Sequence, residues 1–393
     1  MTRRTGRGRV AGDGCRVVAF GTYDARSHPR VQVLIDGLQA HGAHLVELNA
    51  PLGLDTADRV RLLKQPWRLP TLAWRLAARW SELVRGSVRI RRAGSAPDAV
   101  LVGYLGHFDV LLARILFPRT TILLDHLIFA GSTATDRGVQ DGLRVRLLRL
   151  LDRLAISAAD VVIVDTQEHL EMVPAPWRDR AVVVPVGASR TWFDARADAD
   201  ADRVIAEPVA SGTGERGGLG VVFFGLYTPL QGAPVIAEAI RDLPGPGLRF
   251  TMIGTGQDFE RARTLVGDDP RVTWQDWVDA EDLPGLVASH DVCLGVFGTS
   301  AKALSVVPNK VYQGAAAGVA IVTSDSAPQR RMLGESALLV PPGDAAALAA
   351  AIRLLASDDD QLARYRGAAR ELADERFTAA AVTAPLAGAL GAE

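Results

Sequence analysis

The sequence predicts two α/β domains in tandem, each a doubly wound parallel sheet covered by helices, with a cleft between the domains. The first observation is length, because 393 residues suit two domains of roughly 150 to 200 residues each. The second is pattern: short apolar runs alternate with amphipathic stretches along both halves of the chain. A hydrophobic content of 48% and a charged content of 23% supply enough apolar material for two cores.

Composition also limits the classes of function. The net charge is −1, so the chain as a whole has no excess positive charge for binding nucleic acid. The two cysteines, Cys15 and Cys293, lie far apart without metal-ligand spacing, which favours a reducing compartment and argues against a structural zinc site. No apolar run approaches the roughly 20 residues of a membrane-spanning helix, and the basic N-terminal tail lacks the apolar segment of a signal peptide. We therefore expect a cytoplasmic protein.

The first half begins with a predicted strand, helix and strand at 16–20, 31–42 and 44–49. The first strand ends at Gly21, where a ligand can approach the backbone, because open α/β sheets bind ligands at the carboxyl ends of their strands. The loop that follows carries His28 and Arg30, which are either surface side chains or ligand contacts.

A basic stretch at 59–92 interrupts this pattern. It holds ten basic residues and one acidic residue, Glu82. Trp67, Trp74 and Trp80 are interleaved with leucines, a mixture typical of a helix that lies on an anionic bilayer. The alternative is a solvated arginine-rich helix whose tryptophans belong to the core. The stretch makes an anionic membrane surface a candidate partner, at the inner face of the membrane.

Titratable side chains follow two further predicted strands. His107 and Asp109 lie beyond one of them, and the other ends at Asp125 and His126. Catalytic groups usually lie at such strand ends in open α/β sheets. The first half is completed by a helix of alternating leucine and arginine and by two strands, at 142–159, 160–166 and 181–188.

The best linker candidate is 196–219, which is rich in Ala, Asp and Gly and has little apolar periodicity. We therefore predict an N-terminal domain at 1–195 and a C-terminal domain at 220–375. A terminal helix at 376–393 has too little apolar content to stand alone, and we expect it to pack back on the first domain.

The most informative stretch is VPNKVYQGAAAG at 307–318, between two strand-like runs. Pro308 suits the first position of a helix, which puts Asn309, Lys310 and Gln313 in the first turn. A helix start presents unbonded amides and a partial positive charge, and Lys310 adds a full charge. This arrangement predicts an anion site, for a phosphate. The alternative is an ordinary helix start with a solvated lysine.

Five stretches of the second half together resemble the donor domain of retaining glycosyltransferases of the GT-B fold, family 4. They occur in the family's order and spacing: FFGLYTPLQG at 223–232, MIGTGQ at 252–257, VTWQDWVD at 272–279, VPNKVYQGAAAGVAIVTSD at 307–325 and LLVPPGDAAALAAAI at 338–352. The first half resembles the family's acceptor domain more loosely, through GTYDARSHPRV and the strand end at Asp125 and His126. The resemblance implies a GT-B fold, two Rossmann-like domains facing a cleft, and a hexosyltransferase that moves a sugar from a nucleotide sugar to an acceptor hydroxyl with retention of configuration.

The resemblance also implies roles for single residues. Gln313 stands where the family has a glutamate that contacts the ribose, and Ser305 stands where another glutamate contacts the donor sugar. Leu226 and Gln231 stand where an arginine and a lysine grip the diphosphate. All four usual side chains are therefore replaced in this chain. The other donor-binding candidates are Gly21, Gly225, Gly232, Gly254, Trp277 and Asn309, and Trp274 lies near Trp277 where the family holds the base, with core packing expected for at least one of the two.

Lys302 and Lys310 would supply the lost positive charge from the neighbouring loop and helix. Negative charge builds on the departing diphosphate, and fixed cations and amides aimed at it lower the barrier. We therefore expect a metal-independent enzyme whose only additional molecule is the nucleotide-sugar co-substrate, with Lys310 among the catalytic groups. Asp125 and His126 border the acceptor side, and the resemblance favours His126 for a contact near the reacting centre.

Two other functions fit parts of the sequence. Gly254 and Gly256 suggest a nicotinamide-dependent Rossmann enzyme, but Phe259 replaces the third glycine of that fingerprint. The four replacements suggest a catalytically weak nucleotide-sugar-binding or assembly subunit. The sequence identifies neither the sugar, nor the base, nor the acceptor, although the stretch at 59–92 favours a lipid-linked or envelope glycan.

Overall fold

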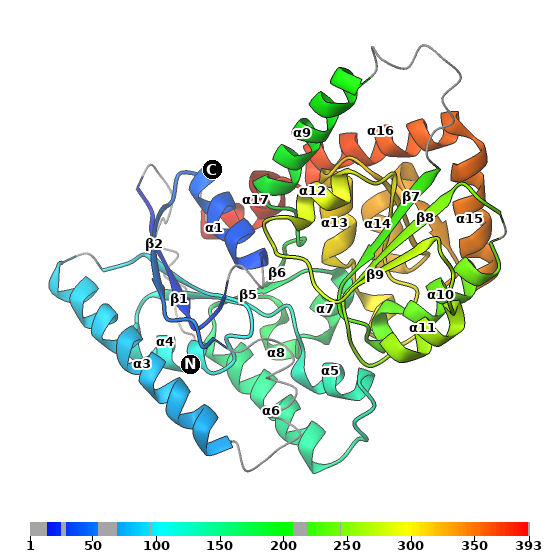
Figure 1. Cartoon of the computed structure of the whole chain (residues 1–393). Helices are drawn as coiled ribbons and strands as arrows, with labels where there is room; N and C mark the ends of the chain where they lie inside the picture. The colour runs from blue at the N-terminus through cyan, green and yellow to red at the C-terminus, as the bar shows by residue number, and fades with distance from the viewer. Residues whose placement is uncertain are drawn as a thin grey trace. The chain divides into compact units, whose positions relative to one another are not determined.

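The computed structural model describes residues 14–24, 29–53, 69–94, 96–206, 218–243 and 245–391. The chain forms two compact units (Figure 1). The first unit comprises Met1–Gly131, Gly142–Pro185 and Ala379–Glu393, and the second comprises Ser132–Asp141 and Val186–Thr378. His28 and residues 59–68, which the sequence singled out, lie outside the described residues.

The first unit contains a six-stranded parallel sheet with the order β2-β1-β3-β4-β5-β6. Its strands are β1 (Arg16–Gly21), β2 (His44–Asn49), β3 (Ala99–Val102), β4 (Thr121–Asp125), β5 (Val161–Val164) and β6 (Ala181–Val183). The predicted strands at 16–20 and 44–49 are confirmed and pair with each other in parallel. The chain leaves β1 towards β2 and then returns to β3 on the other side of β1. This reversal creates a switch point at the carboxyl ends of β1 and β3.

Helices cover both faces of this sheet. They are α1 (Arg30–Ala40), α3 (Leu69–Arg92), α4 (Asp109–Leu116), α6 (Leu143–Ala158), α7 (Gln167–Met172), α8 (Ala175–Arg178) and α17 (Ala379–Leu390). Helix α5 (Ala130–Asp136) belongs to the second unit from Ser132 onwards. Successive strand residues point to opposite faces, so Val18 joins the apolar cluster under α3, α4 and α6. Val17 joins the cluster under α1 and α17. Asp109, Asp125 and His126 therefore lie at strand ends between two helical layers.

The second unit contains another six-stranded parallel sheet, with the order β12-β11-β10-β7-β8-β9. Its strands are β7 (Leu219–Phe224), β8 (Leu248–Ile253), β9 (Val272–Gln275), β10 (Val292–Leu294), β11 (Ala320–Ser324) and β12 (Leu338–Val340). The largest apolar cluster lies between this sheet and helices α10 (Ala233–Arg241), α11 (Phe259–Val266) and α15 (Ala345–Ser357). The switch point lies between β7 and β10, and the loops beyond these two strands therefore form the candidate ligand edge.

The other face of the second sheet carries a second layer of helices. These include α9 (Arg190–Ala206), α12 (Leu283–Ala288), α13 (Asn309–Ala316) and α16 (Asp359–Arg376), while α14 (Ala327–Leu333) follows β11. Three short 3₁₀ turns complete the unit, at η3 (Pro229–Gln231), η4 (Ala303–Ser305) and η5 (Gly334–Ser336). None of the helices in the described part of the chain combines the length and the apolar character needed to cross a membrane.

The predicted linker is wrong at its beginning, because residues 196–206 continue helix α9. Two ion pairs with α16 hold this helix: Arg196 with Asp374 at 2.8 Å and Arg370 with Asp200 at 2.8 Å. Charged contacts of this kind leave no apolar periodicity in the sequence, which is why the stretch resembled a linker. Residues 207–217 lie outside the described residues, and the first unit reaches Pro185, short of the predicted boundary at residue 195.

Close packing of α1 on α17 depends on Gly37. A Cβ atom added at Gly37 would lie 2.2 Å from Thr383 Oγ1 and 2.4 Å from the carbonyl oxygen of Ala379. We expect Gly37→Val to lower the free energy of unfolding of the first unit by about 1–3 kcal/mol, because an overpacked core must shift backbone to make room. Thermal unfolding followed by circular dichroism measures the change.

The matched control is Gly388→Ala in α17, where an added Cβ meets nothing within 4 Å. This change should raise stability by about 0.5–1 kcal/mol, the usual gain of alanine over glycine in a helix. Equal unfolding temperatures for the Gly37→Val variant and the unmodified protein would show that α17 is not held against α1 in this way.

Candidate functional site

The loops beyond β7 and β10 meet through their backbones at the switch point of the second sheet. The amide of Phe297 donates to the carbonyl of Gln231 at 3.0 Å, and the amide of Gly298 donates to that of Leu230 at 3.3 Å. Gly232 has a φ of 67°, and a Cβ there would lie 2.5 Å from the carbonyl carbon of Phe297. Glycine is therefore required at 232 for the two loops to approach this closely.

The loop beyond β8 joins the same edge. Gly254 has a φ of 116°, and a Cβ added there would lie 2.0 Å from the carbonyl oxygen of Gly225. The amide of Tyr227 donates to the carbonyl of Thr255 at 2.9 Å. The structure thus brings together Gly225, Gly232 and Gly254, three of the glycines that the sequence assigned to donor binding.

Helix α13 begins at Asn309, one residue later than expected. Pro308 is the residue before the helix, with an extended backbone at φ −73° and ψ 150°. Its missing N–H still suits this place, because a helix start cannot bond its first amides internally. Asn309 is half-buried, and Gln313 is 8% exposed on the next turn.

Lys310, at the ligand edge of the second sheet, is unusual for a lysine because it is only 4% exposed. Its Nζ donates to Gln231 Oε1 at 2.6 Å and lies 3.7 Å from the centre of the Phe223 ring. A Cβ added at Gly225 would lie 3.3 Å from the same Nζ. Lys310 therefore reaches from α13 to the loop beyond β7, and the alternative of a solvated lysine is wrong. Burial lowers the pKa of Lys310 to about 7, while the nearby Cys293 acts in the opposite direction.

Lys302 and Ser305, which lie between β10 and α13, have local hydrogen-bond partners. Lys302 is half-buried, and its Nζ donates to Thr133 Oγ1 at 2.9 Å. The hydroxyl of Ser300, in the same loop, donates to Asp136. Ser305 is half-buried, and its Oγ donates to the carbonyl of Ala301 at 2.7 Å. Lys302, in the loop beyond β10, is thus held by Thr133 of α5, whereas Lys310 of α13 is held by Gln231 of the loop beyond β7.

The two tryptophans near β9 have different surroundings. Trp274 packs edge-on against Phe259 at 5.6 Å and near Tyr227 at 6.5 Å, so it belongs to the core. Trp277 is 75% exposed, and its indole N–H donates to Asp279 at 3.2 Å. The expectation that at least one of the pair has a packing role is correct for Trp274. Trp277 presents an uncovered ring face.

At the switch point of the first sheet, Gly21 lies against Asp109. The Asp109 carboxylate accepts from the amide and hydroxyl of Thr22, both at 2.8 Å, and from the indole of Trp80 at 2.9 Å. A Cβ added at Gly21 would lie 3.2 Å from Asp109 Oδ2. This network fixes the turn after β1 and ties it to α3 and α4.

Asp125 and His126 are neighbours in sequence but face opposite helical layers. Asp125 is buried and pairs with Arg30 Nε at 2.8 Å, and Arg30 also donates to the carbonyls of Val184 and Pro185 at 3.0 and 3.1 Å. Burial raises the pKa of Asp125, and Arg30 partly offsets this effect. The Asp125 side chain thus joins the ends of β4 and β6 through α1, which is a structural arrangement.

His126 faces the α6 side and is 1% exposed. Its backbone N–H donates to Ile163 at 2.8 Å, while its Nε2 has no hydrogen-bond partner among the described residues. The ring of Phe129 packs edge-on against it at 4.7 Å. Burial, together with the neighbouring His107, lowers the pKa of His126 to about 3. The ring is therefore neutral near pH 7.

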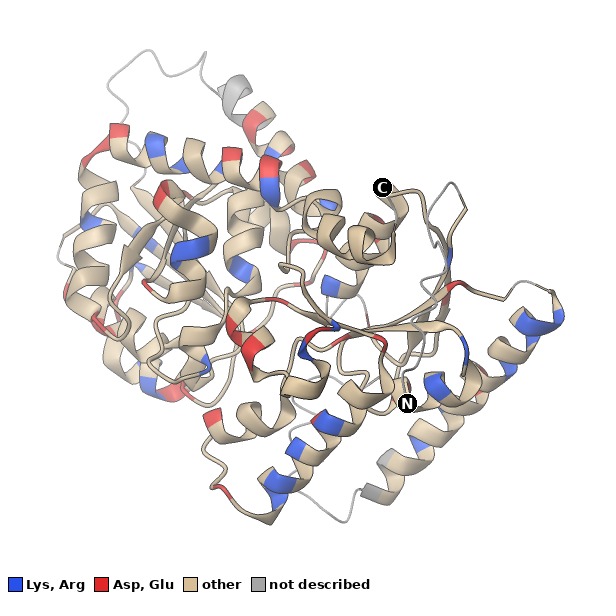
Figure 2. Cartoon of the chain, turned by 180° about the vertical axis from the view of Figure 1, so that it is seen from behind, with Lys and Arg blue, Asp and Glu red and all other residues tan. Residues whose placement is uncertain are grey.

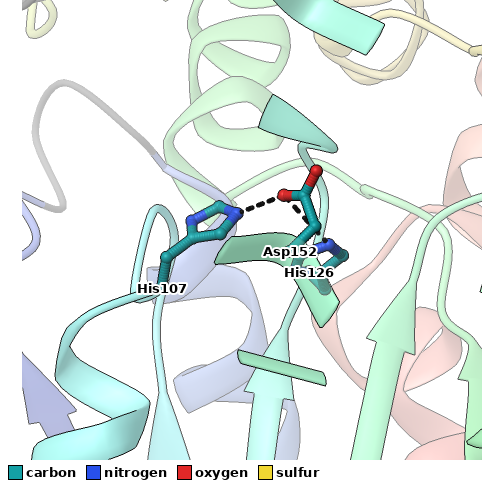
Figure 3. A group of neighbouring side chains, drawn as sticks. All are labelled: His107, His126 and Asp152. Atoms are coloured by element: carbon teal, nitrogen blue, oxygen red, sulfur yellow. Dashed lines mark hydrogen bonds and ion pairs between the residues drawn. The ribbon is translucent and has the colours of Figure 1, made fainter. Parts of the chain in front are cut away.

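Sequence reasoning missed Asp152, which faces these histidines from α6 (Figure 3). Its Oδ1 accepts from His107 Nε2 at 2.9 Å and from the amide of Ala130 at 2.9 Å, and it lies 3.8 Å from His126 Nε2. Burial acts to raise the pKa of Asp152, but the hydrogen bonds from His107 and Ala130 outweigh it and lower that pKa. Asp152 is the only acid in the leucine–arginine stretch at 142–159, a signal that could have identified it.

The same three side chains have the spacing of a metal site. The ligand atoms of His107, His126 and Asp152 all lie within 4.8 Å of one another. The Asp152 oxygens already accept from His107 and from the amides of Ala130 and Gly131, so hydrogen bonding accounts for the buried carboxylate. A second buried pair joins His169 Nδ1 to Asp165 at 2.5 Å, and the His169 ring lies 5.4 Å from that of Phe129.

Comparison with known proteins agrees with this architecture. A family model described as glycosyl transferases group 1 matches residues 218–358, whereas no curated protein sequence matches the chain. HepE (Alr3699) of Anabaena, in complex with UDP-glucose, has a TM-score of 0.64 at 15% identity over 97% of this chain and 100% of that chain.

Two other solved structures give similar values. Sucrose-phosphate synthase (tll1590) of Thermosynechococcus elongatus has a TM-score of 0.64 at 15% identity, covering 96% of this chain and 98% of that chain. A glycosyltransferase of Rickettsia africae has a TM-score of 0.58 at 13% identity, covering 96% and 97%. The GT-B fold expected from the sequence is confirmed.

The lowered pKa of His126 predicts an acid-sensitive first unit. The pKa of an unfolded histidine is about 6.5, so acid protonates the unfolded chain before the folded one. The stability linked to His126 is present above about pH 6.5 and is lost as the pH falls towards the folded pKa of about 3. Between these pH values, urea unfolding should show that the free energy of unfolding falls less steeply with pH in His126→Asn than in the unmodified protein.

His44→Asn, at an exposed histidine on β2, is the matched control and should leave the pH dependence unchanged. An imidazole of His126 that titrates near pH 6.5 by NMR would contradict the assignment.

Proposed function

We propose that the protein is a retaining glycosyltransferase of family 4 type, because residues 218–358 match the model of the glycosyl transferases group 1 family and the chain has the GT-B fold. It would move a sugar from a nucleotide-sugar donor to an acceptor hydroxyl. The observation that carries this proposal is the buried ammonium of Lys310 beside Gly225 and Gln231, at the switch point of the second sheet. This is where open α/β sheets bind ligands.

Lys310 and the start of α13 suit a diphosphate. The first amides of the helix and the Lys310 amine, once protonated, would offer positive charge in a place with little solvent, where such charge acts strongly on a leaving group. Gln231 stands where related enzymes have a lysine, and here it accepts a hydrogen bond from the substitute lysine. We propose that Lys310 of α13 thus replaces the lysine that related enzymes carry in the loop beyond β7. We also propose that catalysis proceeds without a metal ion.

The rest of the donor site follows from the same placement. Gln313, one turn into α13, would bond the ribose, and Asn309 would lie at the phosphate side of the helix start. The exposed ring of Trp277 would stack on the base, with Lys302 and Ser305 nearer the sugar. HepE has been solved with UDP and with UDP-glucose, so a uridine diphosphate sugar is the donor to test first.

On the acceptor side, we assign the contact with the reacting centre to His126. Its neutral ring has an Nε2 with no hydrogen-bond partner among the described residues, and so it keeps a position for a substrate hydroxyl. His107 and Asp152 would hold its surroundings, and Asp125 would act through its pair with Arg30. For the acceptor, we propose a lipid-linked or envelope glycan, reached at the cytoplasmic face of a membrane.

A second function has one observation in its favour. The Ser305 hydroxyl, in the place of a sugar-binding glutamate, is bonded to Ala301 and provides no carboxylate. A catalytically weak nucleotide-sugar-binding subunit would retain the phosphate site and lose the sugar contact. Release of nucleoside diphosphate from a panel of nucleotide sugars separates the two functions, because only the enzyme turns over.

Replacing Lys310 tests the phosphate site. We expect Lys310→Met to weaken UDP binding by about 10- to 100-fold, the loss of one charge-assisted hydrogen bond of about 1.5–3 kcal/mol. Isothermal titration calorimetry measures the affinity, and a methionine should be accepted beside Phe223 without loss of the fold. Unchanged binding and unchanged turnover would place the diphosphate elsewhere.

The pH dependence of UDP binding gives an independent test. Since the pKa of unliganded Lys310 is about 7, the lysine is largely neutral at pH 8 and must take up a proton to pair with the diphosphate. Affinity should therefore fall as the pH rises above about 7, where UDP itself no longer changes charge because its phosphate pKa is about 6. Calorimetry in buffers of different ionisation enthalpy should detect proton uptake, and the uptake should vanish in Lys310→Met.

A further inference from the structure

Helix α6 carries four exposed leucines on one line. Leu143, Leu147, Leu150 and Leu154 are 75%, 57%, 50% and 46% exposed. Their spacing of four, three and four residues places them on one narrow face of the helix, which we call the leucine stripe. Single exposed leucines are ordinary, whereas a contiguous row of them marks a surface that another apolar surface covers.

The orientation of α6 is fixed by its opposite face. Val145, Ala155 and Ile156 are buried in the core of the first unit, and Asp152 is bonded to His107 and to two backbone amides. Leu150 and Asp152 are two residues apart and therefore point to nearly opposite sides of the helix. The leucine stripe cannot turn inwards without pulling Asp152 out of its hydrogen bonds.

The exposed residues of α6 are leucines, arginines and one serine. The remaining exposed residues are Arg144, Arg146, Arg149, Arg153 and Ser157. The one acid of the helix, Asp152, is buried and faces inwards. The outer face of α6 therefore combines an apolar stripe with arginines and has no negative charge.

The same composition continues across the neighbouring helices. Helix α4 packs against both α3 and α6, so these three form one layer over the sheet. Within the layer, Ile115 of α4 and Trp74 of α3 are 74% and 73% exposed. Figure 2 shows the arginines as blue bands along these helices. The described part of α3 adds six arginines and one acid, Glu82, which pairs with Arg79.

The charge of this face distinguishes between two possible partners of the leucine stripe, a second copy of the chain and an anionic bilayer. A second copy of α6 would bring four arginines against the same four, and like charges oppose such pairing. An anionic bilayer offers both complements, because phosphates face the arginines while leucine side chains enter the acyl boundary and tryptophan lies at the interface.

We propose that the outer face of α3, α4 and α6 binds an anionic lipid bilayer, with the leucine stripe of α6 as the element that enters it. The sequence suggested membrane contact only through 59–92, and α6 adds a second, later helix to that surface. This inference stands apart from the proposed glycosyl transfer, because binding to vesicles requires neither donor nor turnover.

The test is sedimentation of the full chain with vesicles of phosphatidylcholine alone and with vesicles that also contain phosphatidylglycerol. We expect binding to the anionic vesicles at low salt and its loss at high salt. The double variant Arg146→Gln/Arg153→Gln should reduce partitioning about tenfold or more, since each arginine near an anionic surface contributes roughly 1 kcal/mol. Leu147→Gln/Leu150→Gln should reduce it similarly and should also abolish the binding that remains at intermediate salt.

The matched control is Arg353→Gln/Leu354→Gln, an exposed pair of the same residue types on α15 of the second unit, which should bind as the unmodified protein does. All of these side chains are exposed, so circular dichroism should show unchanged folding. Equal binding to neutral vesicles, no binding to anionic ones, or unaffected binding in the leucine variant would each overturn the proposal. A dimer by light scattering that Leu147→Gln/Leu150→Gln converts to a monomer would assign the stripe to a second copy instead.

Discussion

The second unit depends on direct backbone contact between the loops beyond β7 and β10. Gly232 and Gly298 allow these loops to hydrogen-bond to each other, since a Cβ at either glycine would lie within 3 Å of backbone atoms of the other loop. The contact leaves no room for side chains at the switch point itself. Lys310 enters from the side, over the ring of Phe223, and ends on Gln231. The buried amine thus lies beside the joined loops, between the Phe223 ring and Gln231.

In the first unit, two titratable side chains lie next to each other at the end of β4. Asp125 and His126 are adjacent, and the alternation of a strand sends one to each side of the sheet. Asp125 faces an arginine, which keeps its charge compensated, whereas His126 faces another histidine, an aromatic ring and a carboxylate already occupied by other donors. The two neighbouring side chains therefore differ in role. Asp125 links elements of the unit through Arg30, whereas His126 Nε2 has no hydrogen-bond partner among the described residues.

The sequence predicted the parallel sheets, most of the strands and the helix start at 308–310, because these depend on local periodicity and on proline and glycine. It could not predict the burial of Lys310, since that depends on Phe223, eighty-odd residues earlier in the chain, nor the role of Asp152, which depends on His107. It misread residues 196–206, where Arg196 and Asp200 take part in ion pairs with α16 and no apolar stripe is needed. Contacts that are both polar and distant in sequence leave no pattern in a local window.

The lowered pKa of Lys310 has a consequence for the charge balance of the second unit. A permanently charged ammonium without solvent would need a fixed counter-ion, and a carboxylate in that role would compete with any incoming anion. An amine that sheds its proton at about neutral pH needs none, and Lys310, whose Nζ donates to the side-chain amide of Gln231, therefore requires no carboxylate beside it. A diphosphate at the proposed site would then meet an amine without a fixed counter-ion, and the amine would gain its charge as the anion binds.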